Sequence, residues 1–277
     1  MSGVYYGSLK KYGSKYKLAC MDMERGYVEY DNREPMSERG SVNSRKLENN
    51  IARARSKVME YTLCNDFDFF ITLTIDAEKH DRYDLNGFVR VFGQWLYNYS
   101  RRKLSNGERI KYLLLPEQHK NRAWHLHGLI MGLPESHLTD FEQRKHPRHL
   151  ICKGYRNWQA YEEKFGFCSL SAINSQEAVS RYMTKYITKD FASMTETLNG
   201  KLYYCSKGLA TSQLVYRNFI TYNGNFDFEN DYCKIKWFNN ESELSAIEEI
   251  GENASFEEAP DAPDWDDEEQ TEIPRGN

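Results

Sequence analysis

Two histidines one residue apart, His125 and His127, are the side chains best suited to chemistry. They lie in an apolar segment, residues 124–131, that has the length and composition of a β-strand. Because residues two apart on a strand share a face, both imidazoles project from the same side of a sheet. Two adjacent imidazoles bind a divalent metal ion when a third ligand is near. Alone the pair is weak evidence, since half-buried histidines without a metal are common in proteins.

Glu117 is the expected third ligand. It ends a second predicted strand, residues 110–117, and the short polar loop 118–123 folds it back beside His125. His119, within that loop, is the alternative ligand, and its position is less constrained. One carboxylate with two imidazoles forms a suitable ligand set for a divalent cation.

A second pattern, within residues 182–190, places two tyrosines and two lysines on one predicted helix. Tyr182 and Tyr186 lie four residues apart, as do Lys185 and Lys189, so each pair shares a helix face. Tyrosines with this spacing are more often core or interface residues than nucleophiles. By itself this pattern is as weak as the first.

The two patterns gain weight together because they supply the parts of one reaction. A tyrosine hydroxyl, with an ordinary pKa of about 10, is a poor nucleophile at neutral pH. Its attack on a phosphodiester becomes feasible when a metal ion polarises the phosphate oxygens and an ammonium group stabilises the developing charge. Metal ligands, tyrosine and lysine all occur in this chain in a sensible order.

Three segments resemble the three motifs of the HUH endonucleases, the Rep-type initiators of rolling-circle plasmids and small single-stranded DNA phages. Residues 69–74 (Phe-Phe-Ile-Thr-Leu-Thr) are similar to the first motif. Residues 125–127 (His-Leu-His) match the second, and residues 182–189 (Tyr-x-x-Lys-Tyr-x-x-Lys) match the third in its two-tyrosine form. The resemblance covers about residues 45–220, and the combination is much more specific than any one motif.

The resemblance implies an antiparallel, ferredoxin-like sheet with Mg²⁺ or Mn²⁺ on its open face, held by His125, His127 and Glu117. It implies cleavage of single-stranded DNA at a replication origin that leaves a 5′-phosphotyrosine and a free 3′-OH. That 3′-OH primes a host DNA polymerase, and the protein later rejoins the displaced strand into a circle. The chain lacks the Gly-x-x-x-x-Gly-Lys-[Ser/Thr] segment of a P-loop, so no fused ATPase is expected and a host helicase would unwind the DNA.

The resemblance also implies roles for the helical residues. Tyr186 is the expected nucleophile, because single-tyrosine plasmid relatives have it before x-x-Lys-Asp, as in this chain. Tyr182 would be the alternating second nucleophile, used in termination. Lys185 and Lys189 would orient or stabilise the phosphate.

Four further residues are predicted DNA contacts. Phe70, Thr72 and Thr74 share one face of the predicted strand, and the Phe70 ring offers a surface on which a base can stack. Arg122, in the loop before His125, is the fourth.

Hydrophobic periodicity predicts an α+β fold. Helices are expected over about 45–61, 85–103 and 174–191, and strands over about 67–75, 110–117, 124–131 and 166–173, with further strands within 200–238. This order favours a central antiparallel sheet, of the ferredoxin or RRM type, with helices packed on one face and an active site on the open face.

Three regions are expected along the chain: a segment of uncertain structure (1–43), the endonuclease domain (44–240, with an insertion at about 134–162) and an acidic, disordered tail (241–277). The tail holds 14 Asp and Glu against one basic residue, which leaves 36 Lys and Arg and 27 Asp and Glu before it, a net charge of +9. A basic body rich in aromatic residues suits a nucleic-acid-binding protein. The tail has three candidate roles, namely binding a host protein, mimicking DNA and aiding solubility.

The sequence shows neither a signal peptide nor an apolar run long enough to cross a membrane. Its six cysteines are scattered, without the paired spacing of a zinc ribbon or the setting of a secreted disulfide scaffold. We therefore expect a cytoplasmic protein, in a bacterial host cell if the resemblance holds, with no membrane partner.

Two other functions stay open. A conjugative relaxase or a single-strand transposase would use related chemistry, but relaxases usually have a three-histidine cluster and an N-terminal tyrosine, and the transposases are usually shorter. A non-catalytic module on an RRM-like sheet would bind nucleic acid through exposed aromatic residues and need no metal. That module gives no reason for Glu117, His125 and His127 to converge. A phage and a plasmid are equally compatible with the sequence.

Overall fold

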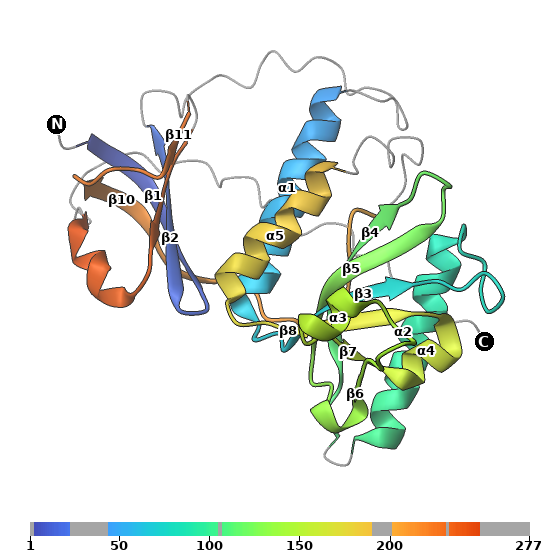
Figure 1. Cartoon of the computed structure of the whole chain (residues 1–277). Helices are drawn as coiled ribbons and strands as arrows, with labels where there is room; N and C mark the ends of the chain where they lie inside the picture. The colour runs from blue at the N-terminus through green and yellow to red at the C-terminus, as the bar shows by residue number, and fades with distance from the viewer. Residues whose placement is uncertain (1–2, 23–43, 105–106, 190–200, 231–232, 250–277) are drawn as a thin grey trace.

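A seven-stranded antiparallel sheet carries the two histidines in the computed structural model (Figure 1). The structure describes residues 3–22, 44–104, 107–189, 201–230 and 233–249. The strands follow one another across this sheet as β6 (Thr139–Asp140), β7 (Arg156–Asn157), β8 (Cys168–Ala172), β3 (Phe69–Thr74), β5 (Trp124–Met131), β4 (Lys111–Gln118) and β9 (Tyr204–Cys205). The predicted α+β fold with a central antiparallel sheet is confirmed.

Helix α2 (Leu85–Lys103) covers one face of this sheet. Asp84 caps its N-terminus by accepting a hydrogen bond from the backbone N–H of Gly87 (2.9 Å), and three basic residues complement the dipole of its last turn. With α4 (Gln159–Phe165) it encloses an aromatic-rich core, whose members include Phe88, Phe92, Trp158, Tyr161 and Phe165 from the helical side and Ile71, Leu73 and Leu126 from the strands.

The opposite face is not open throughout, as the sequence analysis expected. Helices α1 (Ser44–Cys64) and α5 (Gln176–Lys189) pack on part of it, so helices lie on both sides of the sheet (Figure 1). The reason lies in β4, where the consecutive residues Leu113, Leu114 and Leu115 are all buried. Apolar side chains on both faces of a strand need cover on both faces, and α1 and α5 provide it on the second.

A separate six-stranded sheet joins the two ends of the described chain. Its order is β11 (Phe228–Glu229), β12 (Lys234–Phe238), β2 (Lys15–Asp22), β1 (Gly3–Tyr12), β10 (Gln213–Tyr222) and β13 (Ile247–Glu249). It encloses its own small core around Leu18, Cys20 and Ile220.

The predicted division of the chain at residues 43 and 240 stays a prediction, but the sheets partition the residues differently. Strand β1, from the segment considered uncertain, pairs along its length with β10, from the expected endonuclease domain. At the start of the acidic tail, Glu241–Ala246 forms a 3₁₀ helix and β13 adds to the same sheet. Residues 250–277, the rest of the predicted disordered tail, lie outside the described residues.

Contacts near the β1–β2 hairpin tie this second sheet to the helices on the histidine sheet. Lys15, at the start of β2, forms an ion pair with Glu177 of α5 (2.8 Å). The Glu60 carboxylate of α1 accepts a hydrogen bond from the backbone N–H of Ser212 (2.8 Å). Helices α1 and α5 therefore touch both sheets.

The expected insertion begins after β5 with a short 3₁₀ helix (Glu135–His137), continues through β6, α3 (Arg148–Cys152) and β7, and ends in α4. It extends the histidine sheet beyond β8 and buries Trp158 and Tyr161 completely. Within the described residues, no helix combines the length and the apolar character that spanning a membrane requires.

Candidate active site

Strands β3, β5 and β4 bring the predicted ligands into two adjacent rungs of the sheet. In one rung Thr74, His125 and Glu117 are aligned, and in the next Thr72 is aligned with His127. Side chains two apart on a strand share a face, so all five project from the face that α1 and α5 only partly cover. The structure thus places the three predicted metal ligands together.

Each histidine is held by a side chain from a neighbouring strand. The Glu117 carboxylate lies 2.6 Å from Nε2 of His127, although Glu117 is aligned with His125 along the backbone. The hydroxyl of Thr72 lies 3.1 Å from Nδ1 of His127, and that of Thr74 lies 3.3 Å from Nδ1 of His125. The two threonines, expected to contact DNA, therefore have the imidazoles as partners here, and a DNA contact by either stays a prediction.

These contacts matter because a hydroxyl both donates and accepts hydrogen bonds. While Nε2 of His127 donates to Glu117, the Thr72 hydroxyl can donate to Nδ1. If Nε2 instead offered its lone pair to a cation, Nδ1 would carry the proton and Thr72 would accept it. The hydroxyl serves either tautomer without moving the ring, which is the role that outer partners of metal-binding histidines perform.

Burial sets the charge state of both imidazoles. It lowers the pKa of His125 to about 4, with His119 and His127 adding to the shift. Burial also lowers the pKa of His127, although the Glu117 carboxylate acts in the opposite direction. Both rings are therefore neutral at pH 7, and only a neutral imidazole has a lone pair for a metal ion.

His119 lies at the rim of the same group. The β4–β5 loop is closed by hydrogen bonds from the His119 N–H to the Ala123 carbonyl (2.9 Å) and from the Arg122 N–H to the His119 carbonyl (2.8 Å). This turn sets the His119 ring against that of His125, with centroids 3.9 Å apart. The structure thus brings both candidate third ligands near the His-x-His pair, Glu117 by a hydrogen bond and His119 by ring contact.

The donors fit a divalent cation in kind, with two neutral imidazoles and one carboxylate on a single face. Within the described residues, however, no three His, Cys, Asp or Glu side chains are already arranged as a metal-binding group. The Glu117–His127 hydrogen bond uses two of the atoms that a cation would need. A bound Mg²⁺ or Mn²⁺ would have to replace that hydrogen bond, and the cofactor stays a prediction.

Gly128 enables the close approach of β5 to β4 at this point. A Cβ atom at residue 128 would lie 2.2 Å from the Leu113 carbonyl oxygen, closer than any side chain can come. A glycine directly after His127 is thus required for the pairing that brings Glu117 to the histidines. The sequence signal was a glycine inside an otherwise apolar strand, whose role depends on the neighbouring strand.

Helix α5 presents Tyr186 to the histidines. Met183 and Ile187 of this helix are buried beside Leu115 and Leu129 of the sheet and fix its rotation. The Tyr186 ring then lies parallel to the His127 ring, with centroids 4.7 Å apart and planes inclined by 23°. The structure therefore joins the second sequence pattern to the first.

Tyr182 stands one turn earlier on the outer side of Tyr186. The two hydroxyl oxygens are 2.5 Å apart, within hydrogen-bond distance, and the Tyr182 ring is 45% exposed. Phe70 meets Tyr182 edge-on (centroids 5.2 Å apart) and stacks on His127 at 6.1 Å. Phe70 therefore belongs to an aromatic cluster with both tyrosines and His127, and its stacking on a base stays a prediction.

Three other predicted residues are less closely joined to the site. Lys185 is exposed and makes no hydrogen bond or ion pair within the described part of the chain. The side chain of Lys189 lies outside the described residues. Arg122 is exposed at the β4–β5 turn with a φ of 64°, a left-handed conformation that is uncommon for a residue with a side chain. Roles for these three residues in binding phosphate stay predictions.

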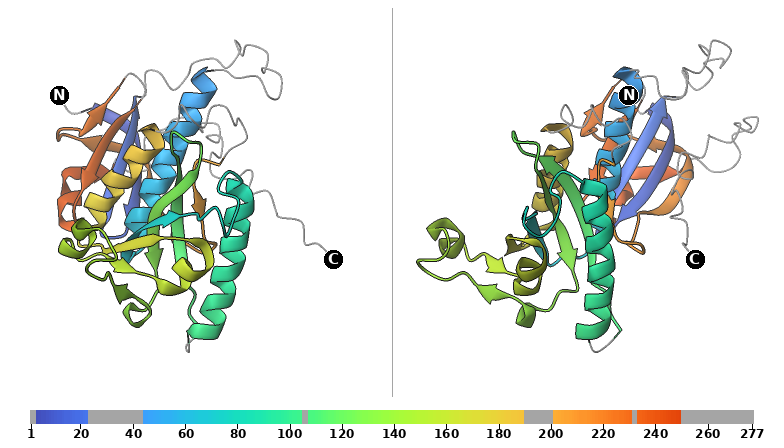
Figure 2. Two further views of the ribbon diagram at one scale, coloured as in Figure 1. Left: turned by 45° about the vertical axis from the view of Figure 1, so that its right-hand side comes forward. Right: turned by 90° about the vertical axis from the view of Figure 1, so that its right-hand side faces the viewer.

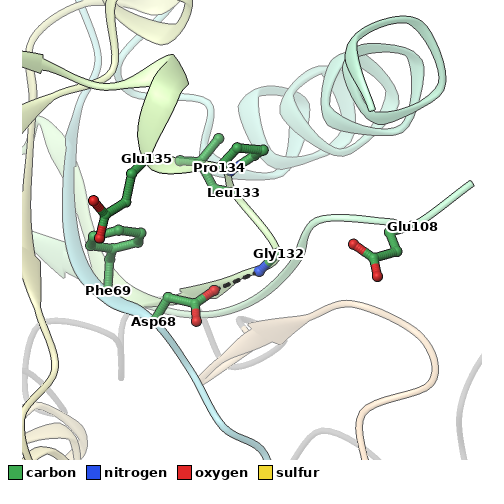
Figure 3. Close-up of a pocket in the computed structure, with 7 residues that line it drawn as sticks. All are labelled: Asp68, Phe69, Glu108, Gly132, Leu133, Pro134 and Glu135. Carbon is green, nitrogen blue, oxygen red and sulfur yellow. Dashed lines mark hydrogen bonds between the residues drawn. The ribbon is translucent and has the colours of Figure 1, made fainter. Parts of the chain in front are cut away.

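A cavity of about 260 Å³ lies elsewhere, at the opposite ends of β3 and β5 from the histidines (Figure 3). Its acidic members are Asp68, Glu108 and Glu135, and Asp68 accepts a hydrogen bond from the Gly132 N–H (2.7 Å). Carboxylates without a basic partner repel a phosphate backbone. This cavity is therefore unsuited to DNA, and the histidine–tyrosine group remains the candidate active site.

One protein family, described as Replication-associated protein ORF2, has a model that matches residues 68–191, a little under half of the chain. The matched segment contains both histidines, Glu117 and both tyrosines. This similarity supports an association with DNA replication for this part of the molecule. No curated protein and no solved structure matches the chain.

Proposed function

We propose that this protein nicks and rejoins single-stranded DNA at a replication origin and so starts and ends rolling-circle replication of a phage or plasmid. The observation that carries the proposal is the stacking of Tyr186 on His127, which is hydrogen-bonded to Glu117. A nucleophilic hydroxyl thus stands beside a set of cation ligands, and these groups come from residues far apart in the sequence. The similarity of residues 68–191 to replication-associated proteins supports the same role.

In the proposed reaction the Tyr186 oxygen attacks the phosphorus of the scissile phosphodiester and loses its proton. The bond from phosphorus to the 3′ oxygen breaks, and that oxygen takes up a proton to become a free 3′-OH. The 5′ phosphate stays on the tyrosine. Attack of a 3′-OH on the phosphotyrosine reverses these changes and rejoins the strand.

His125, His127 and Glu117 would hold the divalent cation. When bound, the cation would supply positive charge that polarises the phosphate and stabilises the charge of the transition state. The chain itself contributes orientation, because Tyr186 sits on a helix whose rotation is fixed by buried Met183 and Ile187. Fixed geometry of this kind lowers the barrier by avoiding the entropic cost of bringing the groups together.

Tyr182 has two parts in the proposal. Its hydroxyl, 2.5 Å from that of Tyr186, can donate a hydrogen bond to the phenolate that forms when the first tyrosine loses its proton. With 45% of its surface exposed, Tyr182 can also receive a strand itself and serve as the second nucleophile. Lys185, exposed one residue before Tyr186, is proposed to contact the phosphate, together with Lys189.

The proposed partners are single-stranded origin DNA, a host helicase and a host DNA polymerase that extends the 3′-OH, in the cytoplasm of a bacterial cell. The order of the motifs, with the tyrosines after the histidines, favours an initiator over a relaxase. A single-strand transposase would differ by joining two element ends to each other.

The test is a denaturing gel of the full chain with a random pool of labelled single-stranded DNA and Mn²⁺. Wild type should give a denaturant-resistant, metal-dependent adduct, and sequencing the trapped DNA would identify the origin. Tyr186→Phe keeps the ring on His127 and removes only the nucleophilic oxygen, so the adduct should fall strongly, and His125→Ala should abolish it.

Tyr182→Phe is the matched control, because it leaves Tyr186 in place. An adduct that persists in the Tyr182→Phe/Tyr186→Phe double variant would exclude both tyrosines as nucleophiles. Absence of any adduct with either metal, while DNA binding is intact, would favour the non-catalytic binding module instead.

A further inference from the structure

The insertion between β5 and β8 carries a basic segment that the proposed reaction does not use. Residues 144–153 contain four Lys and Arg residues and no Asp or Glu. We propose that Arg144, Arg148 and Lys153, named here the insertion patch, bind the phosphate backbone of the single strand that leaves the candidate active site. This inference rests on the proposed function for the identity of the bound strand.

The charges of the insertion patch are uncompensated, unlike those around it. Nearby, Lys145 pairs with Glu142 (2.6 Å) and Arg156 with Asp140 (2.9 Å). Arg144, Arg148 and Lys153 are exposed and have no ion pair within the part of the chain that the structure describes. Three exposed cations without carboxylate partners in a ten-residue segment are complementary to a polyanion.

The insertion patch is attached to the face of the sheet that bears the histidines. The Thr74 N–H donates to the Phe167 carbonyl (2.9 Å), so Phe167 continues the rung of Thr74 and His125. Alternation with buried Cys168 directs the Phe167 ring to the histidine face. Phe141 of the insertion stacks on this ring with centroids 5.6 Å apart.

The insertion therefore begins two strand spacings, roughly 10 Å, from His125. Figure 2 shows it projecting from the sheet on the side where α5 lies. A strand held between the sheet and α5 has a direct route across β8 to the insertion patch.

The insertion patch also has a firm support. Phe141 and Leu150 are buried, and the turn between them is closed by the His146 N–H, which donates to the Glu142 carbonyl (3.2 Å). Arg144 sits in this turn with a φ of 74°. Arg144 and Arg122 are the non-glycine residues with positive φ in the described chain, and they lie on opposite sides of the histidines. Arginine brings neither turn a conformational advantage, whereas its charge suits a phosphate on each side of the site.

The salt dependence of DNA binding tests this proposal. Each phosphate contact to a single strand contributes about −0.7 to the slope of log affinity against log salt concentration, because bound counterions are released. The Arg144→Ala/Arg148→Ala/Lys153→Ala variant should bind a labelled single-stranded oligonucleotide with a slope shallower by about 2. Between 50 and 200 mM salt, its affinity should fall roughly twenty-fold less than that of the wild type.

The control variant is Arg90→Ala/Arg102→Ala/Lys103→Ala, which removes three exposed cations from α2 on the opposite face of the sheet. It changes the net charge equally and should keep the wild-type slope. Equal slopes for the insertion-patch variant and the wild type would overturn the proposal, as would an equal loss in the α2 variant. Tighter binding of a duplex than of the single strand would overturn the choice of ligand.

Binding should be measured in EDTA and in the Tyr182→Phe/Tyr186→Phe background, where no covalent capture takes place. The slope then reports reversible contacts alone. A slope change without any adduct in the denaturing-gel experiment would reject the nicking proposal and retain the insertion patch as a DNA contact. An adduct with an unchanged slope would do the reverse.

Discussion

The two faces of the histidine sheet are made by the same strands and are built for different purposes. On the α2 face, Ile71, Leu73 and Leu126 lie in a continuous apolar core. One residue further along each strand, Thr72, Thr74, His125 and His127 form a polar group that α5 covers only at the level of Tyr186. The comparison teaches that stability and chemistry are divided by the strand alternation, so substitutions on one face should leave the other property largely intact.

The largest effect on stability is expected on the α2 face. Phe92 is 1% exposed and contacts other rings of that core, including Phe88 and Tyr161. Phe92→Ala should lower the free energy of unfolding by about 3–5 kcal/mol, because it removes buried surface and leaves a cavity. Urea unfolding monitored by circular dichroism measures this loss. A loss below that of Thr72→Val, on the other face, would break the proposed division.

Thr72→Val tests the chemical face. It removes the hydroxyl that lies 3.1 Å from Nδ1 of His127 and preserves the shape of the side chain. Mn²⁺ affinity should fall about 10–100-fold, the usual loss when an outer partner of a ligating histidine is removed. Titration of the protein with Mn²⁺, followed by electron paramagnetic resonance, gives the affinity.

Thr72→Ser retains the hydroxyl and should keep the Mn²⁺ affinity near that of the wild type. Equal affinities for Thr72→Val and the wild type would show that the threonine does not position His127. The urea midpoint of each variant separates positioning from a general loss of structure.

The pH dependence of stability should also distinguish the faces. Since the pKa of His125 is lowered to about 4 in the folded state, the unfolded chain, with its ordinary value near 6.5, binds the proton more readily. The resulting stability is present above pH 6.5 and is lost as the pH falls toward 4. With allowance for partial solvent exposure, the loss should be about 1–2 kcal/mol in metal-free buffer.

His125→Gln removes this titration, so the difference in unfolding free energy between wild type and variant should change with pH in that window. A constant difference between pH 7 and pH 4.5 would contradict the assigned pKa. Phe92→Ala is the control, because it removes no titrating group and its cost should not vary with pH.

The smallest effect is expected in the insertion. Arg144→Gly replaces a residue with φ of 74° by one that adopts this conformation freely. The unfolding free energy should stay the same or rise by up to about 1 kcal/mol, while affinity for single-stranded DNA falls. Thermal unfolding and oligonucleotide binding measure the two quantities. A large loss of stability would show that Arg144 serves the fold.

The sequence predicts the elements with strong local patterns. Apolar residues at helical spacing identified α2 at its observed bounds, and alternation identified β3 and β5. The second sheet was not predicted, because β1 and β2 are rich in Tyr and Lys and acquire their role only by pairing with β10, some two hundred residues later. The helices on the histidine face were missed because the consecutive leucines of β4 were interpreted as one-sided.

The candidate site was predictable in composition but not in detail. Residue type and spacing selected both histidines, Glu117 and both tyrosines. Register decides the rest: the partner of Thr72 depends on its alignment with His127, and the stacking of Tyr186 depends on how Met183 and Ile187 seat α5. Such long-range alignments leave no local trace in a single sequence.

The pairing of β1 with β10 has a consequence for biosynthesis. Gly3 aligns with Tyr222, so the first strand to leave the ribosome waits for one of the last. At about 5–20 residues per second, that wait is roughly 10–40 seconds. The histidine sheet, complete once β9 has been made, can assemble during this interval. The molecule is therefore expected to mature from its middle outward, with the catalytic scaffold formed before the chain ends meet.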